Sequence, residues 1–377
     1  MRRASLPLAV LAVAVVASTT LAACEDPPRI TPRTRTGSIS TTTSMVPPSL
    51  SGSAASSRPA LSAPAPIPDR PHVVLPKGAC SADRWCVDGS IDVPRDLHDV
   101  WGASGHDVWA VGDGGTILHF QGVWSRVNSG TTLDLQRVCG SSDDDAWAVG
   151  TSDSSKSSAL LHWDGTSWAV QNRPAGAAAI NAVLAIAKND LWIAGNDDDM
   201  EVAHWDGTTW ITYDLPGHVA SIVALWASGP SDVWAVDPSG VLAHWDGAIW
   251  TPFPTHGEGL TDVWGSGPRD VWAIGSTTAG GESMLRFDGA TWSRPSADSD
   301  AAWSRVRGTG PKDVWLVGSS QGAPALMHFD GAAWKDSVID AGDRSHPVRP
   351  AAIWGASADD LWLVGADGAI LRRQQKK

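Results

Sequence analysis

The stretch Asp107-Val108-Trp109-Ala110-Val111 contains the pattern that decides the fold of this chain. The same pattern, an Asp, an apolar residue, a Trp and two further small or apolar residues, occurs seven times in the 377 residues. Successive copies are 38 to 47 residues apart, and this is about the length of one four-stranded propeller blade. The seven Trp residues are Trp109, Trp147, Trp192, Trp234, Trp272, Trp315 and Trp362.

Alignment on this pattern predicts four strands in each repeat. Consecutive apolar residues in the second strand indicate that both of its faces are covered, as in blades stacked around an axis. The first strand lies eight residues upstream and carries Trp101, Cys139, Leu184, Trp226, Trp264, Arg307 and Trp354. The fourth strand carries Trp124, Trp168, Trp210, Trp250, Trp292 and Trp334. We therefore predict an all-β, seven-bladed β-propeller of four-stranded blades.

The last repeat ends after its third strand, at Ile370-Leu371-Arg372. Trp85 precedes Leu97 by 12 residues, the same interval that separates the fourth-strand Trp168 from Ile180. We expect the segment around Trp85 to complete the last blade, because closure of the ring removes the exposed strand edges that promote aggregation.

The N-terminus predicts export and a lipid anchor. A basic start, an apolar run and Leu-Ala-Ala-Cys at 21–24 have the layout of a secretion signal, and the last four residues resemble a lipobox. We predict a lipoprotein signal peptide over 1–23 and lipidation of Cys24. The Pro, Ser and Thr-rich segment 24–78 contains too few large apolar residues to fold and is predicted to be a disordered tether. The propeller then spans 79–377.

Charge and cysteine content restrict the partners and the compartment. The first 78 residues hold eight of the 28 Lys and Arg but three of the 41 Asp and Glu, which leaves a net charge of −18 on 79–377. A domain this acidic is not expected to bind nucleic acid or anionic lipid. Membrane contact would therefore be through the lipid anchor alone. Cys80 and Cys86 are predicted to form a disulfide in an oxidising compartment, and Cys139 to be an apolar filler rather than a reactive thiol.

The repeats resemble those of secreted bacterial β-propeller lipoproteins with tandem Val-Trp-Ala-Val-Gly and His-Trp-Asp-Gly-x-x-Trp phrases. The resemblance covers about Cys80 to Arg373 and implies a fold and a location. WD40 repeats are similar in part, through the Trp-Asp pairs at 163, 205 and 245, but the Gly-His element of that family is not repeated. Asp-Gly-Thr-x-Trp at 164–168 and 206–210 is similar in part to the Asp-box of sialidase-like propellers.

Two polar positions recur in the repeats, and we interpret both as structural. The Asp that opens the second strand can accept hydrogen bonds from turn amides. The third strand carries His119, His162, His204, His244 and His328. These His residues lie on five different blades, and packed sheets are about 10 Å apart, so packing or an inter-strand hydrogen bond is favoured over a shared metal ion.

The acidic run Asp197, Asp198, Asp199 and Glu201 leaves two interpretations open. Calcium could bind there, although the spacing differs from that of an EF-hand loop. A solvated charge run is the alternative. No other cofactor is predicted.

Loop lengths indicate where a ligand would bind. In a four-stranded meander the second-to-third and fourth-to-first loops lie on one face, which we call the loop rim. The Trp to His or Arg interval across the second-to-third loop varies from 10 to 15 residues, whereas the turns on the opposite face are constant. Loops on a rigid scaffold are where binding usually occurs. The candidate ligand residues are Asp153, Asp198, Glu282, Gln321 and Arg307.

These patterns favour a binding module over an enzyme. The hypothesis is a monomeric, lipid-anchored propeller at the outer membrane or cell surface that binds a protein or a polysaccharide without chemistry. Tyr213 is the sole Tyr and Glu is scarce, and the common hydrolase motifs are missing from the sequence. A carbohydrate-active hydrolase or lyase is the alternative, and a purely structural spacer is a third interpretation.

Overall fold

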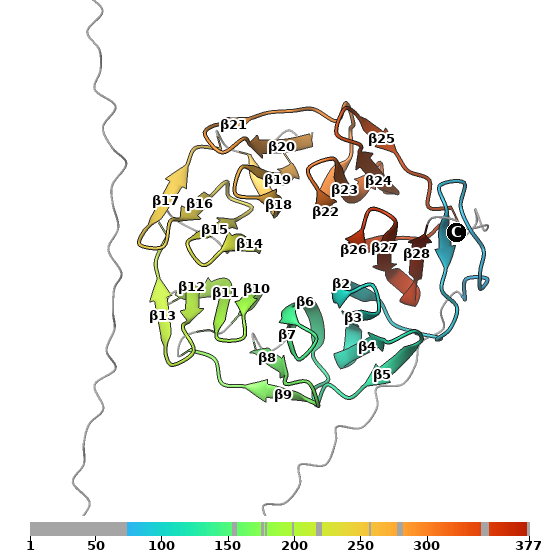
Figure 1. The fold of residues 1–377 in the computed structure, drawn as a ribbon, viewed down its shortest axis with the longest axis horizontal. Helices are drawn as coiled ribbons and strands as arrows, with labels where there is room; N and C mark the ends of the chain where they lie inside the picture. The colour runs from blue at the N-terminus through green and yellow to red at the C-terminus, as the bar shows by residue number, and fades with distance from the viewer. Residues whose placement is uncertain are drawn as a thin grey trace, which may run out of the picture.

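A ring of seven antiparallel sheets surrounds a central axis (Figure 1). The structure is a computed structural model that describes residues 74–152, 157–174, 177, 179–197, 200–215, 221–255, 258–276, 282–340 and 347–374. Each sheet has four strands in meander order, with the first strand nearest the axis. The predicted seven-bladed propeller is confirmed. The signal peptide, Cys24 and nearly all of the tether lie outside the described residues.

The first three blades follow one another along the chain. The first is formed by β2 (Leu97–Ser104), β3 (Asp107–Gly112), β4 (Thr116–Phe120) and β5 (Trp124–Val127). The second is formed by β6 (Asp134–Ser142), β7 (Asp145–Ser152), β8 (Ser157–Trp163) and β9 (Trp168–Gln171). The third is formed by β10 (Ile180–Ala187), β11 (Asp190–Asp197), β12 (Met200–Trp205) and β13 (Trp210–Tyr213).

The remaining blades repeat this plan. The fourth is formed by β14 (Ala224–Gly229), β15 (Asp232–Val236), β16 (Leu242–Trp245) and β17 (Trp250–Phe253). The fifth is formed by β18 (Gly259–Gly267), β19 (Asp270–Ser276), β20 (Glu282–Phe287) and β21 (Trp292–Ser293). The sixth is formed by β22 (Ala302–Gly310), β23 (Asp313–Ser320), β24 (Ala323–Phe329) and β25 (Trp334–Asp336). The seventh is formed by β26 (Pro350–Ser357), β27 (Asp360–Gly365), β28 (Ile370–Gln374) and β1 (Trp85–Val87).

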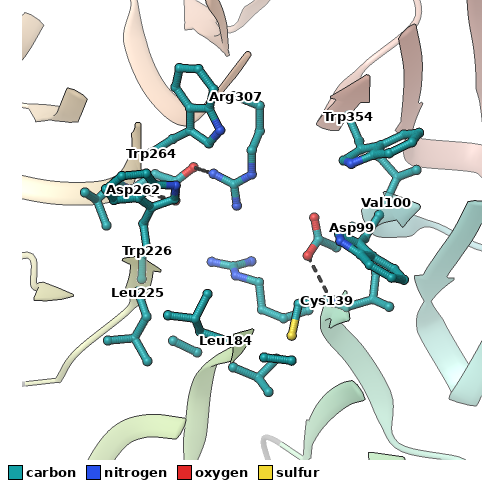
Figure 2. A pocket seen from close by; sticks show the side chains of 18 of the residues that line it. Asp99, Val100, Cys139, Leu184, Leu225, Trp226, Asp262, Trp264, Arg307 and Trp354 are labelled. Carbon is teal, nitrogen blue, oxygen red and sulfur yellow. Dashed lines mark hydrogen bonds and ion pairs between the residues drawn. The ribbon is translucent and has the colours of Figure 1, made fainter. Parts of the chain in front are cut away.

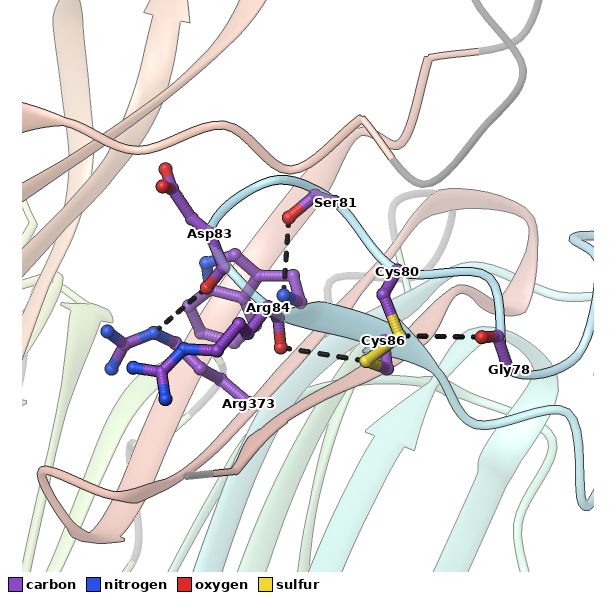
Figure 3. Close-up of a disulfide and its surroundings, with 8 residues drawn as sticks. Gly78, Cys80, Ser81, Asp83, Arg84, Cys86 and Arg373 are labelled. Atoms are coloured by element: carbon purple, nitrogen blue, oxygen red, sulfur yellow. Dashed lines mark hydrogen bonds between the residues drawn. A yellow bond between two sulfur atoms is a disulfide. The ribbon is translucent and has the colours of Figure 1, made fainter. Parts of the chain in front are cut away.

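The N-terminal strand β1 closes the ring, as the spacing of Trp85 predicted. It pairs antiparallel with β28, with Trp85 opposite Arg373 and Val87 opposite Leu371. The Trp85 ring is fully buried and meets Trp315 of the preceding blade edge to face, at a centroid distance of 5.6 Å. The predicted disulfide between Cys80 and Cys86 flanks this strand (Figure 3).

Aromatic contacts between blades make up much of the core. The fourth-strand Trp of one blade meets the second-strand Trp of the preceding blade edge to face, as Trp168 does with Trp109 at 5.2 Å and 86°. Six interfaces show this geometry, including the one made by Trp85. Edge-to-face pairs add about 0.5–1.5 kcal/mol each to the gain from burial. Trp85 therefore contributes to the ring as an ordinary fourth-strand Trp does.

The repeated Asp and His positions meet within each blade. In four blades the His Nε2 lies 2.6 to 2.8 Å from the Asp Oδ1, and in the first blade His119 and Asp107 are 3.3 Å apart. Arg286 and Arg372 take the place of His in the fifth and seventh blades and pair with the corresponding Asp. Each His also stacks on the second-strand Trp.

Among the described residues, side chains and not turn amides donate to this Asp position, which corrects one expectation. Asp145 accepts from His162, from the Ser141 hydroxyl at 2.6 Å and from the Trp147 indole at 3.2 Å. Side chains reach this carboxylate because it faces into the sheet beside the His and Trp rings. Turn amides are bound instead by the hairpin Asp, for example Asp164. The Asp that opens the second strand and the third-strand His contact each other within the blade, in agreement with their structural interpretation.

Across the ranges given above, no helix reaches the length and apolarity required to cross a membrane.

Candidate ligand site in the central channel

The innermost strands surround a cavity of ≈ 250 Å³ on the axis of the ring (Figure 2). Its wall includes residues from the first strand of all seven blades. In Figure 2 the labelled Asp99, Asp262 and Arg307 lie around this central space, together with Trp226, Trp264 and Trp354. The site is therefore built from one repeated strand, and each blade contributes the residues of its own first strand.

One layer of the wall is built by the first-strand positions that the alignment singled out. Trp101, Trp226, Trp264 and Trp354 are half-buried there. Each packs on a glycine of the next blade; a Cβ on Gly140 would lie 2.4 Å from Cη2 of Trp101. The same relation holds for Gly265, Gly308 and Gly102. In two blades the Trp position holds the smaller Cys139 or Leu184. The following blade then has Ala185 or Ala227 in place of the glycine. The four indoles are thus part of the ring's own packing.

A second layer lies two residues earlier on each first strand and carries the charge. Its residues are Asp99, Arg137, Ala182, Ala224, Asp262, Arg305 and Ala352, and all of them except Arg305 and Ala352 line the cavity. Because the first strand leads away from the fourth-to-first loop, this layer lies nearer to the loop rim than the Trp layer does. The charged residues are confined to two pairs of adjacent blades.

Both channel carboxylates serve the contact between neighbouring blades. Asp99 is 5% exposed, and its Oδ2 accepts from the backbone N–H of Val138 at 3.0 Å. The Oδ2 of Asp262 accepts from the N–H of Val306 at 2.9 Å and from the Arg307 guanidinium at 2.7 Å. These bonds join the first blade to the second and the fifth to the sixth. The charge of each Asp is therefore stabilised within the fold.

Arg137 and Arg305 lack such partners. Arg137 lines the cavity and donates to the adjacent Gln136 carbonyl at 3.2 Å. Arg305 donates to the adjacent Ser304 carbonyl at 2.8 Å, and its Nε is buried without an acceptor. Neither forms an ion pair with a described carboxylate. Both side chains are partly exposed, so their remaining donors are accessible to an anionic acceptor.

The charges at the axis act on one another. The pKa of Arg137 is lowered to about 10, first by burial and then by the positive charge of Arg305. Asp99 and Asp262 act in the opposite direction. Arg137 therefore remains protonated at neutral pH. With Arg307 included, three guanidiniums face two carboxylates, so the axis has a positive excess inside a domain of net charge −18.

The predicted ligand residues do not come together as one described site. Arg307 lies in the channel and forms an ion pair with Asp262. Gln321 lies in the tight turn between β23 and β24 and donates to Asp300 at 3.4 Å. Asp153 and Asp198 lie outside the described residues, and Glu282 is described only through its backbone pairing with Ser276. The loop-rim site remains a prediction.

The calcium interpretation is also untested. Asp198 and Asp199 lie outside the described residues, and of Asp197 only the strand position is described. The Glu201 carboxylate accepts from the N–H of Leu215. Among the described residues, no group of three or more His, Cys, Asp or Glu is arranged to hold a metal ion. Cys139 lines the cavity, and burial raises the pKa of its thiol, so it is present as the neutral thiol.

Arg137 and Arg305 are the functional candidates that the sequence analysis missed. The alignment drew attention to the first-strand column that is mostly Trp, whereas these two residues lie two positions earlier on the same strand. Side chains i and i+2 of a strand point to the same face. Opposite charges at this second position on adjacent blades were the available signal.

Comparisons with known proteins give the fold and no family. No protein-family model matches the chain, and no curated protein matches it. A structure of YCF48 bound to a D1 peptide covers 80% of this chain and 100% of its own, with a TM-score of 0.59 and 19% identity. Virginiamycin B lyase from Staphylococcus aureus with quinupristin covers 74% and 94%, with a TM-score of 0.60 and 13% identity.

The WD40 β-propeller domain of Doa1 is also similar, covering 75% of this chain and 94% of its own, with a TM-score of 0.57 and 12% identity. At these identities the similarity shows a shared propeller fold. The chain therefore has a propeller fold, which is often used for binding. The similar structures include both binding proteins and enzymes.

Proposed function

We propose that this chain is a monomeric binding module of the cell envelope, anchored through Cys24, that holds a protein partner without performing chemistry. The central channel, entered from the loop rim, is the proposed ligand site. The observation that carries the proposal is the guanidinium of Arg137, which lines the central cavity without an ion-pair partner among the described residues, with Arg305 at the equivalent position of the sixth blade. A fold can do without such donors, whereas a receptor for a charged group needs them.

The size of the cavity supports recognition of one part of a larger partner. Its volume of ≈ 250 Å³ is below the range of about 300–1,000 Å³ that is common for pockets of drug-sized ligands. One side chain or a chain end fits such a space, while the rest of the partner would lie on the loop rim.

A protein partner is favoured over a polysaccharide by two points. The similar YCF48 structure is bound to a D1 peptide, so a propeller of this shape accommodates one. The channel indoles pack on the glycines of neighbouring blades, whereas sugar recognition needs exposed aromatic faces.

Binding without turnover is favoured by the state of the channel carboxylates. Asp99 and Asp262 both accept backbone N–H bonds from the next blade. A general acid or base must be within reach of the substrate and free to exchange a proton. These two carboxylates are instead held in structural bonds.

The test applies the purified chain to a peptide array and an oligosaccharide array and follows the bound molecules by mass spectrometry. We expect retention of peptides, unchanged in mass, with at least tenfold weaker binding to Arg137→Met. The control is Arg269→Met, which removes an exposed arginine in the turn between β18 and β19. Retention of oligosaccharides alone, or cleavage of a bound molecule, would refute the proposal.

A further inference from the structure

We propose that Arg137 and Arg305 form a receptor for a carboxylate group of the partner peptide, supplied by its C-terminus or by an Asp or Glu side chain. This inference rests on the proposed function and specifies the chemistry of its site. Nothing else in the described residues gives these two guanidiniums a role.

The first step is the number of donors left over. A guanidinium has five N–H donors and no acceptor. Within the described residues, each of these two arginines donates one hydrogen bond, to the carbonyl of the residue before it. The Nε of Arg305 is buried and has no acceptor. The remaining donors are therefore available to the acceptor atoms of a ligand.

The second step is a comparison with Arg307 in the same channel. Arg307 follows Arg305 by two residues on β22, and its guanidinium is neutralised by Asp262 at 2.7 Å. A structural arginine in this channel is thus stabilised by a carboxylate of the fold itself. Arg137 and Arg305 have no equivalent partner, so the missing carboxylate is assigned to the ligand.

The third step is the repeat itself. The equivalent position on three other blades is Ala182, Ala224 or Ala352, so the ring closes without an arginine there. Retaining both arginines opposes folding, since the positive charge of Arg305 lowers the pKa of Arg137. Such a cost is expected at a binding site rather than at a packing position.

The fourth step is geometric selectivity. Arg binds carboxylates through two parallel N–H bonds, which a Lys cannot reproduce. A carboxylate also reduces the repulsion between the guanidiniums of Arg137 and Arg305, because it offers two oxygens and one negative charge. The net charge of the five channel groups would become zero on binding.

The test uses three small peptides and the full purified chain. N-acetylglycylglycine presents a terminal carboxylate, its amide presents none, and N-acetylaspartylglycinamide presents a side-chain carboxylate. Isothermal titration calorimetry in low salt measures the affinity of each. We expect binding of at least one carboxylate peptide and at least tenfold weaker binding of the amide.

The variants are Arg137→Met, Arg305→Met and Arg137→Lys, with Arg269→Met as the matched control. Each Met variant is expected to weaken carboxylate binding at least tenfold, the Lys variant to retain part of it, and the control to match the wild-type chain. Thermal unfolding of each variant checks the fold. Loss of binding together with an unchanged melting temperature supports the proposal.

The failures of the two proposals are distinguishable. If array peptides bind equally well to the wild-type chain and to Arg137→Met and Arg305→Met, the protein-binding function stands and the carboxylate receptor is refuted. If the small carboxylates bind through these arginines but the array retains no peptide, the anion site stands and the peptide partner is refuted. Binding of a polyuronate but of none of the peptides would likewise refute the peptide.

Discussion

Removal of the Trp85 side chain tests whether the N-terminal strand closes the ring. In Trp85→Ala the chain loses a fully buried indole, an edge-to-face contact with Trp315 and an indole hydrogen bond to Ser337 at 3.2 Å. Replacement of a buried Trp by Ala costs about 3–5 kcal/mol, and about 0.5–1.5 kcal/mol of this comes from the aromatic pair. We expect urea unfolding to show a loss of about this size.

The location of the effect distinguishes closure from general destabilisation. β1 has three residues, and among the described strands it pairs with β28 alone. Its other edge is bonded to the short segment around Ala79 and Ser81, so it should detach before the other strands open. Hydrogen exchange of the β28 amides is then expected to become faster in Trp85→Ala. The matched control is Trp168→Ala, a fourth-strand Trp that is 7% exposed and has the same edge-to-face contact. An equal loss of protection at β28 in both variants, or a loss below about 1 kcal/mol for Trp85→Ala, would refute the reasoning.

Three further predictions concern the ring. Reduction of the Cys80–Cys86 disulfide should destabilise the chain by about 2 kcal/mol, because the closed loop is short, and urea unfolding with and without reductant measures this; no change would contradict it. The pKa of Asp145 is lowered because hydrogen bonds from His and Ser side chains outweigh burial, which alone would raise it. The folded chain then binds fewer protons than the unfolded chain, so stability should fall as pH drops through about 4, and Asp145→Asn should reduce this dependence; an unchanged slope would refute it. Gly140→Ala should cost about 1–3 kcal/mol through overpacking against Trp101, and Trp101→Leu should recover part of that loss in a double-mutant cycle; strict additivity would exclude the contact.

The number of blades and the closure of the ring could be predicted from the sequence because both depend on periodicity. A Trp at 38 to 47 residue intervals specifies one blade each time, and the spacing of Trp85 matched that of a fourth strand. The inter-blade aromatic contacts follow from the same columns. The repeat also identified Arg307 as a departure from Trp.

The site was less accessible to sequence reasoning because it depends on differences between blades. Arg137 and Arg305 stand beside the columns that define the repeat, and an Arg on a strand is most often a solvated residue. Their importance emerges when seven first strands converge on one axis and bring distant charges together. The partners of the Asp column were also missed, since the register that places Asp145 beside His162 is set by strand pairing.

The proton on Nε of Arg305 offers the most direct measurement of the channel site. In a ¹⁵N-labelled chain its side-chain N–H signal can be assigned by its loss in Arg305→Met. The account predicts that N-acetylglycylglycine or N-acetylaspartylglycinamide shifts this signal to higher frequency, as expected for a new charge-assisted hydrogen bond, whereas the amide of N-acetylglycylglycine leaves it in place. A signal that neither carboxylate peptide moves at saturation, or that the amide moves as far as they do, would contradict the account.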